Sequence, residues 1–108
     1  MHSKLIVARM DPGSSAAVAR IFSSFDSGEM PGLMGTVRRQ LFTYNGLYFH
    51  LQDFEVEDGG VMIENMKSHP AFMQISDDLK SHITAFDPAT WRSPSDAMAT
   101  SFYHWSRS

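Results

Sequence analysis

The N-terminal part of the chain shows a short apolar run followed by a helical stripe. Residues 4–10 are mostly aliphatic and partly β-branched, and Asp11-Pro12-Gly13 follows them, so this run predicts a buried strand. After a cap at Ser14 or Ser15, apolar residues recur at i, i+3, i+4 and i+7. They are Val18, Ile21, Phe22 and Phe25. This spacing predicts a helix whose apolar stripe covers a sheet.

The most informative pattern lies in residues 36–54, where two β-rich runs flank Asn45-Gly46. This dipeptide favours the positive φ angles of a type I′ turn, so we expect a hairpin with a two-residue loop. The expected pairs are Tyr44–Leu47, Phe42–Phe49, Leu41–His50 and Arg39–Gln52. One face then carries Arg38, Gln40, Phe42, Tyr44, Leu47, Phe49 and Leu51, and the other carries Val37, Arg39, Leu41, Tyr48, His50 and Gln52. Arg39 and His50 become diagonal neighbours on one face.

The remaining segments are predicted from breaker residues and periodicity. Residues 27–35 hold three Gly and one Pro among Met and Leu, which indicates a loop with apolar side chains that could cover a pocket. Gly59-Gly60 precedes a short helix over 61–67, and Pro70 begins a second helix. Its stripe is Phe72, Ile75, Leu79, Ile83 and Phe86. A loop then leads to residues 98–105, for which we expect a fourth strand.

The element order β-α-β-β-α-β predicts an α+β, ferredoxin-like fold with a four-stranded antiparallel sheet, of the dimeric α/β-barrel type. Residues 1–108 are expected to form a single domain. Because the helices cover one face of such a sheet, the other face needs a partner. We expect a homodimer formed face to face, with Phe102, Tyr103 and Trp105 contributing apolar surface.

Composition narrows the function classes. A hydrophobic fraction of 43% with 12% aromatic residues supports a packed core, and a formal charge of -3 disfavours nucleic acid and anionic lipid as partners. There is no Cys, which excludes disulfides, thiolate nucleophiles and thiolate metal sites. We expect no targeting leader in the first ten residues and no membrane span, and therefore a cytoplasmic protein.

Three residues are candidates for chemistry. His50 can exchange a proton near neutral pH, Arg39 can hold a developing oxygen anion, and Asp26 lies where the first helix gives way to the loop. Each also has a purely structural interpretation, because His50 can simply bond a neighbour, Arg39 can form a surface ion pair and Asp26 can form a turn. For His69, before Pro70, helix capping is favoured. The spacing of the five His predicts no metal site.

Apolar residues around these three could form a cavity for a flat aromatic molecule, although such residues more often form the core. The candidate substrate-binding residues are Phe25, Met30, Leu33, Met34, Leu41, Tyr48, His69 and Phe72, with Phe42 and Phe49 as further apolar candidates.

Several motifs together resemble the tetracenomycin-type aromatic polyketide cyclases. The motifs are Gly35-Thr-Val-Arg38-Arg39-Gln-Leu-Phe42 with Gly46-Leu-Tyr48-Phe-His50-Leu51, Arg9-Met10-Asp11-Pro12, Glu29-Met30-Pro31, Ser68-His69-Pro70-x-Phe72 and Phe102-Tyr103-x-Trp105. Two stretches are most similar to the angucycline-pathway branch, namely Gly46–Phe54 and Asp87-Pro-Ala-Thr-Trp91-Arg92-Ser-Pro-x-Asp96-Ala-Met98. The resemblance implies a ferredoxin-like dimer without cofactor, and pocket roles for Arg39, His50 and Asp26. It departs at Phe25, where many relatives have a histidine.

The function expected from this resemblance is regiospecific aldol-type ring closure and aromatisation of an intermediate made by a type II polyketide synthase, whose components are candidate partners. Two alternatives share the fold. One is a cofactor-free monooxygenase in which a substrate carbanion reacts with dioxygen. The other is a non-catalytic subunit that binds and shields the intermediate, because one scaffold hosts many functions.

Overall fold

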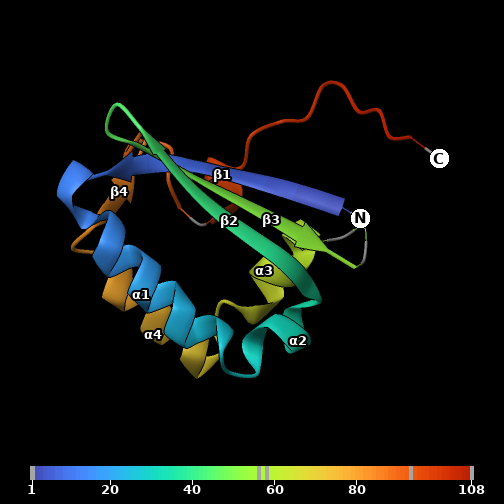
Figure 1. The fold of residues 1–108 in the computed structure, drawn as a ribbon, viewed down its shortest axis with the longest axis horizontal. Helices are drawn as coiled ribbons and strands as arrows, with labels where there is room; N and C mark the ends of the chain where they lie inside the picture. Colours follow the sequence, from blue (N-terminus) through green and yellow to red (C-terminus); the bar gives the residue numbers. More distant parts are fainter. Residues whose placement is uncertain (1, 56, 58, 93, 108) are drawn as a thin grey trace.

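The computed structural model describes residues 2–55, 57, 59–92 and 94–107. Four antiparallel strands, β1 (His2–Met10), β2 (Thr36–Tyr44), β3 (Leu47–Phe54) and β4 (Ile83–Ala85), form one sheet in the order β2-β3-β1-β4. The helices α1 (Ser15–Asp26), α2 (Met30–Met34), α3 (Gly59–Met66) and α4 (Pro70–Leu79) cover one face of this sheet (Figure 1). Short 3-10 turns occupy Pro12–Ser14 and Pro94–Ala97. The α+β, ferredoxin-like arrangement predicted from the element order is confirmed.

The first strand and helix form where the pattern predicts them. Strand β1 runs through the centre of the sheet, and Ile6 pairs with His50 of β3. Ser14 stands at the N-cap position of α1 without a side-chain capping bond, and Val18 and Phe22 are buried against the sheet. The apolar stripe of α1 therefore covers the strands as expected.

The central hairpin has the predicted register. Asn45 and Gly46 have φ angles of 50° and 75°, as a type I′ turn requires. The predicted pairs are all present, namely Tyr44–Leu47, Phe42–Phe49, Leu41–His50 and Arg39–Gln52. Alternation along the strands thus places Arg39 and His50 on the face that the helices cover, which we call the inner face.

One residue of the hairpin departs from simple alternation. A bulge lies between Thr36 and Arg38, so Val37 has no place in the pairing and is exposed. Thr36 takes the inner-face place beside Gln52, and the two side chains are hydrogen-bonded. The expectation that Val37 shares a face with Arg39 is therefore wrong, because one extra residue reverses the alternation.

Two segments differ from the predicted elements. The segment predicted as a loop over 27–35 contains the short helix α2, which ends at the left-handed Gly35. Helix α4 ends at Leu79 instead of continuing to Phe86, and Ile83–Ala85 forms β4 along the edge of β1. Ile83 continues the helical spacing of the apolar stripe. A segment of three residues is too short, however, for its hydrophobic pattern to distinguish a further helical turn from a short strand.

The fourth strand predicted over 98–105 is wrong, because β4 already pairs with Ala8, Arg9 and Met10 at the same edge of β1. Of the described residues in this range, only Met98 and Ala99 contact the edge of β1 beyond β4. Met98 forms an isolated β-bridge with Ile6, and the Ala99 N–H donates to the Leu5 carbonyl. Residues 99–107 contain no helix or strand. This tail leaves the domain on the side opposite the helices (Figure 1).

Two groups of buried residues form the core. The first joins Ala8, Met10, Val18, Phe22, Tyr48 and Ile75, and the second joins Met30, Met34, Phe54 and Ile63. Phe25 packs against both groups. In the part of the chain that the structure describes, no helix has the length and apolar character needed to cross a membrane.

We expect Gly46→Ala to lower the free energy of unfolding by about 1 kcal/mol, because a Cβ is strained at its positive φ. Gly32→Ala is the matched control, since Gly32 lies in α2 at a negative φ with open space around its Cα. Urea titration of both variants measures the difference. Equal stability of the two variants would contradict the importance of this turn.

Candidate active site

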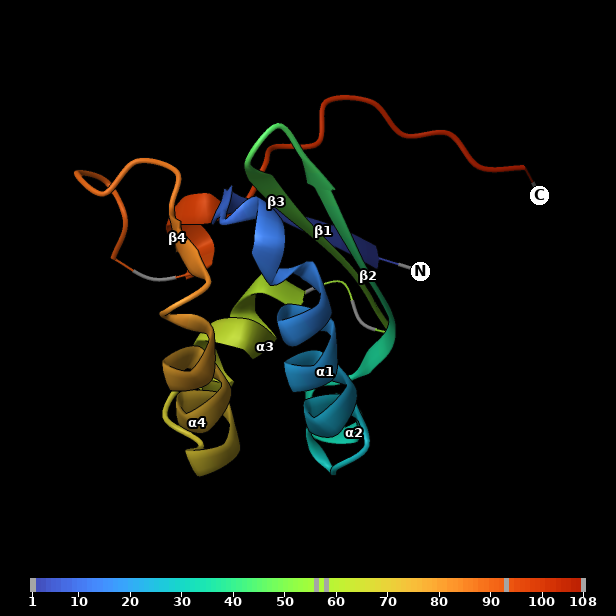
Figure 2. The ribbon, with the colours of Figure 1, turned by 60° about the vertical axis from the view of Figure 1, so that its left-hand side comes forward.

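A cavity of about 1050 Å³ lies between the inner face of the sheet and the helices. Helices α1 and α4 stand on the same side of the sheet and contact each other (Figure 2). Phe22 and Phe25 of α1 and Ile75 of α4 line the cavity, together with polar residues of β2 and β3. Trp91 and Arg92, from the segment after β4, also line it. The lining is mostly apolar with a small number of polar groups, which is typical of sites for small organic molecules.

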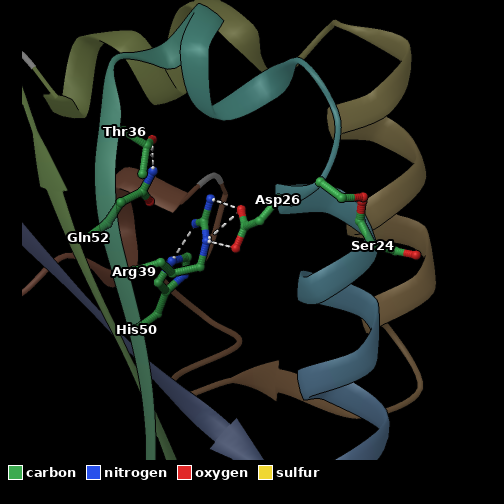
Figure 3. Close-up of polar contacts among 7 residues, drawn as sticks. Ser24, Asp26, Thr36, Arg39, His50 and Gln52 are labelled. Atoms are coloured by element: carbon green, nitrogen blue, oxygen red, sulfur yellow. Dashed lines mark hydrogen bonds and ion pairs between the residues drawn. The ribbon is translucent and has the colours of Figure 1, made fainter.

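Arg39 is the only cation on the cavity wall that we find fixed from several directions among the described residues. Its Nη2 donates to Asp26 Oδ1 at 2.8 Å, and its Nε lies 3.0 and 3.1 Å from the two carboxylate oxygens (Figure 3). The guanidinium carbon stands 5.1 Å from the ring centre of Phe22 and 5.6 Å from that of Phe25. The Arg39 side chain is only 8% exposed. A two-point carboxylate contact and two aromatic rings therefore hold the charge in one orientation.

His50 is fixed by the same guanidinium. Arg39 Nη1 lies 2.8 Å from His50 Nε2. Because a guanidinium can only donate, Nε2 must be the acceptor, and the ring proton of neutral His50 sits on Nδ1. Burial lowers the pKa of His50, and the charge of Arg39 lowers it further, to about 3. The imidazole is thus neutral at neutral pH, with its Nε2 lone pair already engaged.

Arg39 retains donors for a ligand. Its Nε, one Nη1–H and one Nη2–H are engaged by Asp26 and His50. A guanidinium has five N–H groups, so two have no hydrogen-bond partner within the described parts of the chain. Since Arg39 lines the cavity, these donors can bind an oxygen atom there, and an oxygen that gains negative charge is favoured most.

Two further polar side chains lie on the same face of β3. Tyr48 and Gln52 line the cavity on either side of His50 in the sequence. Burial raises the pKa of the Tyr48 phenol well above its usual range, and the charge of Arg39 opposes this only in part, so the hydroxyl keeps its proton. Gln52 Nε2 donates to Thr36 Oγ1 at 2.7 Å (Figure 3).

The structure brings together the three residues chosen for chemistry, but in two different positions. Arg39 and His50 line the cavity, whereas Asp26 contacts the far side of the guanidinium and is not among the lining residues. The ion pair considered for Arg39 is therefore present, with Asp26 as its partner. The contact that the structure gives Asp26 is with Arg39, whose guanidinium it orients.

The candidate substrate-binding residues divide into two groups. Phe25, Met34, Tyr48 and Phe72 line the cavity, whereas Met30, Leu33, Leu41 and His69 are not among its lining residues. Met30 is buried in the core and Leu33 is exposed. His69 caps α4, accepting a hydrogen bond from the backbone N–H of Ala71, as its position before Pro70 suggested. Which residues contact a ligand stays a prediction.

The suggestion that Phe42 and Phe49 line the cavity is wrong. They pair with each other on the opposite, outer face of the sheet, because Leu41 and His50 occupy the inner face one residue away. Sequence reasoning also missed Gln52 and Thr36 as site residues. The predicted register does place Gln52 on the same face as Arg39 and His50. That shared face was the signal in the sequence that could have identified Gln52 as a site residue.

No group of three His, Cys, Asp or Glu side chains that could hold a metal ion occurs among the residues the structure describes. The acidic group nearest to the site chemistry, Asp26, is occupied by Arg39.

We expect the folded protein to lose stability as pH falls below about 6.5, because the unfolded chain then protonates His50 while the folded chain does not until about pH 3. This group alone gives a slope of up to about 1.4 kcal/mol per pH unit. His50→Gln removes the titration and should flatten the slope between about pH 6 and pH 4. Urea titrations at several pH values measure it, and identical slopes in both proteins would disprove the assignment.

The chain is similar to known proteins over almost its whole length. Residues 2–106 match the model of the family described as "Polyketide synthesis cyclase". The chain is 48% identical over 108 residues to an uncharacterized protein of Streptomyces coelicolor, covering 99% of this chain and 96% of the other. It is 40% identical over 110 residues to polyketide synthase CurG of Streptomyces cyaneus, covering 99% of each. Tetracenomycin F2 cyclase of Streptomyces glaucescens is 32% identical over 104 residues, covering 96% of this chain and 94% of the other.

The solved structure of tetracenomycin F2 cyclase, a type II polyketide cyclase, superposes with a TM-score of 0.91 over 100% of both chains, at 30% identity. An antibiotic biosynthesis monooxygenase superposes with a TM-score of 0.53 over 77% of this chain and 86% of the other. At 9% identity, the latter shares the fold alone. With a family model matched over almost its whole length, the chain belongs to the polyketide synthesis cyclase family.

Proposed function

We propose that this protein directs the regiospecific, aldol-type closure and aromatisation of a later ring in an aromatic intermediate made by a type II polyketide synthase, as in angucycline-type pathways. The observation that carries the proposal is the Arg39–His50 pair on the wall of a largely apolar cavity. The reaction needs an anion-binding group, a proton carrier and a shaped space, and these residues can supply all three without metal or organic cofactor.

The shape of the cavity selects which carbons meet. A poly-β-ketone chain has several acidic methylenes and several electrophilic carbonyls, so unguided closure gives a mixture of rings. A cavity of about 1050 Å³ lined by Phe22, Phe25 and Phe72 can hold the chain with one methylene against one carbonyl. Fixing the reacting atoms in this way removes much of the entropic cost of their encounter.

Arg39 stabilises the oxygen that becomes negative. When a proton leaves the methylene, the electron pair of the C–H bond passes into an enolate, whose oxygen accepts from the free N–H groups of Arg39. The enolate carbon then attacks the ketone carbon, and the new alkoxide takes up a proton. Because Asp26 and two aromatic rings already orient the guanidinium, little reorganisation is needed as charge develops.

His50 carries the proton, and its basicity depends on the substrate. Arg39 Nη1 engages His50 Nε2 before the reaction, and this contact and burial keep the imidazole neutral. When the carbonyl oxygen of the substrate takes over Nη1–H, the Nε2 lone pair of His50 is freed. His50 then accepts the methylene proton as the enolate forms, and the negative charge that develops on the oxygen offsets the positive charge beside the ring. The protonated His50 returns the proton to the alkoxide, and loss of water completes the aromatic ring.

We expect Arg39→Gln to slow ring closure by about 100-fold to 1000-fold, since an oxyanion donor is removed, and to spread the products over several ring patterns. His50→Ala should slow closure by a comparable factor because the proton carrier is lost. The measurement is product analysis of a type II polyketide synthase reaction reconstituted with each protein. Circular dichroism verifies that the variants are folded.

Arg38→Gln is the control, because Arg38 is exposed on the outer face one residue from Arg39. It should keep the native product profile. Wild-type rate and regiochemistry in both Arg39→Gln and His50→Ala would refute the assigned roles. Stoichiometric uptake of dioxygen would indicate a monooxygenase, and an unchanged product profile when the wild-type protein is omitted would indicate a non-catalytic binding subunit.

We further propose that the protein works as a homodimer in the cytoplasm, beside the synthase components that supply its substrate. Phe42 and Tyr44 are exposed on the outer face of the sheet, and Phe102 and Trp105 are exposed on the tail that leaves on that side. A second copy would cover these exposed aromatic side chains.

Phe42→Asp should therefore convert the dimer to a monomer, because a carboxylate would be buried without a partner at the interface. Val61→Asp is the control, since Val61 is equally apolar and exposed but lies on α3, among the helices. Light scattering after size-exclusion chromatography gives the mass of each. A monomeric wild-type protein at micromolar concentration would refute the dimer.

A further inference from the structure

Three buried polar side chains stand in a row along the inner face of β3. Tyr48, His50 and Gln52 are 4%, 7% and 2% exposed, and all three line the cavity. Alternate residues of a strand point to the same face and lie about 7 Å apart, so the row spans about 13 Å. That length is comparable with the long axis of a fused polycyclic aromatic skeleton. Arg39 meets the row at its middle, where it contacts His50.

The two ends of the row have polar atoms without protein partners. Among the described residues, no hydrogen bond involves the Tyr48 hydroxyl, and the only one made by the Gln52 amide is the donation from Nε2 to Thr36 Oγ1. No fully buried side-chain nitrogen or oxygen of the described residues lacks a hydrogen bond. The Tyr48 hydroxyl and Gln52 Oε1 must therefore keep some accessible surface, and the cavity that both residues line is where it opens.

The chemistry of the two ends differs. The Tyr48 phenol is uncharged and can donate to a carbonyl or phenolate oxygen. Gln52 Oε1 can only accept, so it suits a ligand hydroxyl. In the structure the Thr36 hydroxyl accepts from one N–H of the Gln52 amide, which leaves Oε1 and the second N–H for a ligand, and only a ligand with a donor such as a hydroxyl can satisfy Oε1.

We infer that Tyr48 and Gln52 are specificity-determining residues that bind oxygens at the two ends of one edge of a flat polycyclic substrate, with a hydroxyl required at the Gln52 end. This inference rests on the proposed function for its substrate class. A substrate turned end for end would place a carbonyl oxygen against Gln52 Oε1. Both oxygens are hydrogen-bond acceptors, so no hydrogen bond could form between them. Such a mismatch leaves buried polar groups unpaired and disfavours the wrong orientation.

The experiment measures binding without turnover, using 2-hydroxyanthraquinone, whose hydroxyl forms no internal hydrogen bond, and its methyl ether, which lacks the hydroxyl donor. Quenching of tryptophan fluorescence gives both dissociation constants. Wild-type protein should prefer the hydroxyl probe. Gln52→Leu should weaken binding of the hydroxyl probe by about 5-fold to 10-fold and leave the ether unaffected, whereas Tyr48→Phe should weaken both probes by a similar factor, because both keep the carbonyls.

Gln40→Leu is the matched control, because Gln40 lies in the same hairpin on the outer face and pairs with Leu51. It should keep the wild-type preference. Thr36→Val tests positioning: it should reduce the preference for the hydroxyl probe by releasing the Gln52 amide. A residue that only stabilised the hairpin would lower the unfolding temperature without changing that preference.

The inference is overturned if folded Gln52→Leu keeps the wild-type preference, or if wild-type protein binds neither probe or both equally. These results are independent of ring closure. If Arg39→Gln abolishes closure while Gln52→Leu keeps the probe preference, the proposed function survives and this inference fails. If the wild-type protein does not change the product profile but the predicted preferences hold, the proposed function fails and the hydrogen-bonding roles of the row remain.

Discussion

The contact between Asp26 and Arg39 is the interaction on which the site depends. It joins the end of α1 to β2 and fixes a guanidinium that is almost entirely removed from solvent. A buried charge without such a partner would be strongly destabilising. The pair also divides the five donors of Arg39, because one side of the guanidinium faces the carboxylate while the other faces His50 and the cavity. Positive charge is thus retained inside an apolar space where an oxygen anion can use it.

The same arrangement explains why a histidine can lie there without being charged. Burial disfavours the protonated ring of His50 most, and the charge of Arg39, which occupies the Nε2 lone pair, disfavours it further. In the proposed reaction the substrate oxygen competes with His50 for one N–H group. Anion binding and base activation would then be two results of one displacement, and neither residue would work well without the other.

Much of the site could be predicted from the sequence because the hairpin is a local structure. Asn45-Gly46 sets the turn, the turn sets the register, and the register places Arg39, His50 and Gln52 on one face. The partnership of Asp26 with Arg39 could not be derived in the same way, since it depends on how α1 packs across the sheet. The bulge at Val37 was also missed, because no Gly or Pro marks it in the sequence.

The C-terminal third was harder to predict for a different reason. Ile83–Ala85 and residues 98–99 share one edge of β1, each through very few backbone contacts. Tertiary contacts decide such short pairings more than the local sequence pattern does. The pattern alone therefore predicts that the helical stripe of α4 continues and that the aromatic tail is a strand, and both predictions are wrong.

The position of Asp26 in α1 has a consequence for cooperativity. It is the last residue of the helix, and no basic residue lies in the last turn. A carboxylate at this end is disfavoured by the helix dipole, whose negative pole is at the C-terminus. Arg39, contributed by a strand, supplies the compensating cation. Docking of the hairpin therefore stabilises the final turn of α1, and the contact that orients the guanidinium also couples this helix end to the sheet.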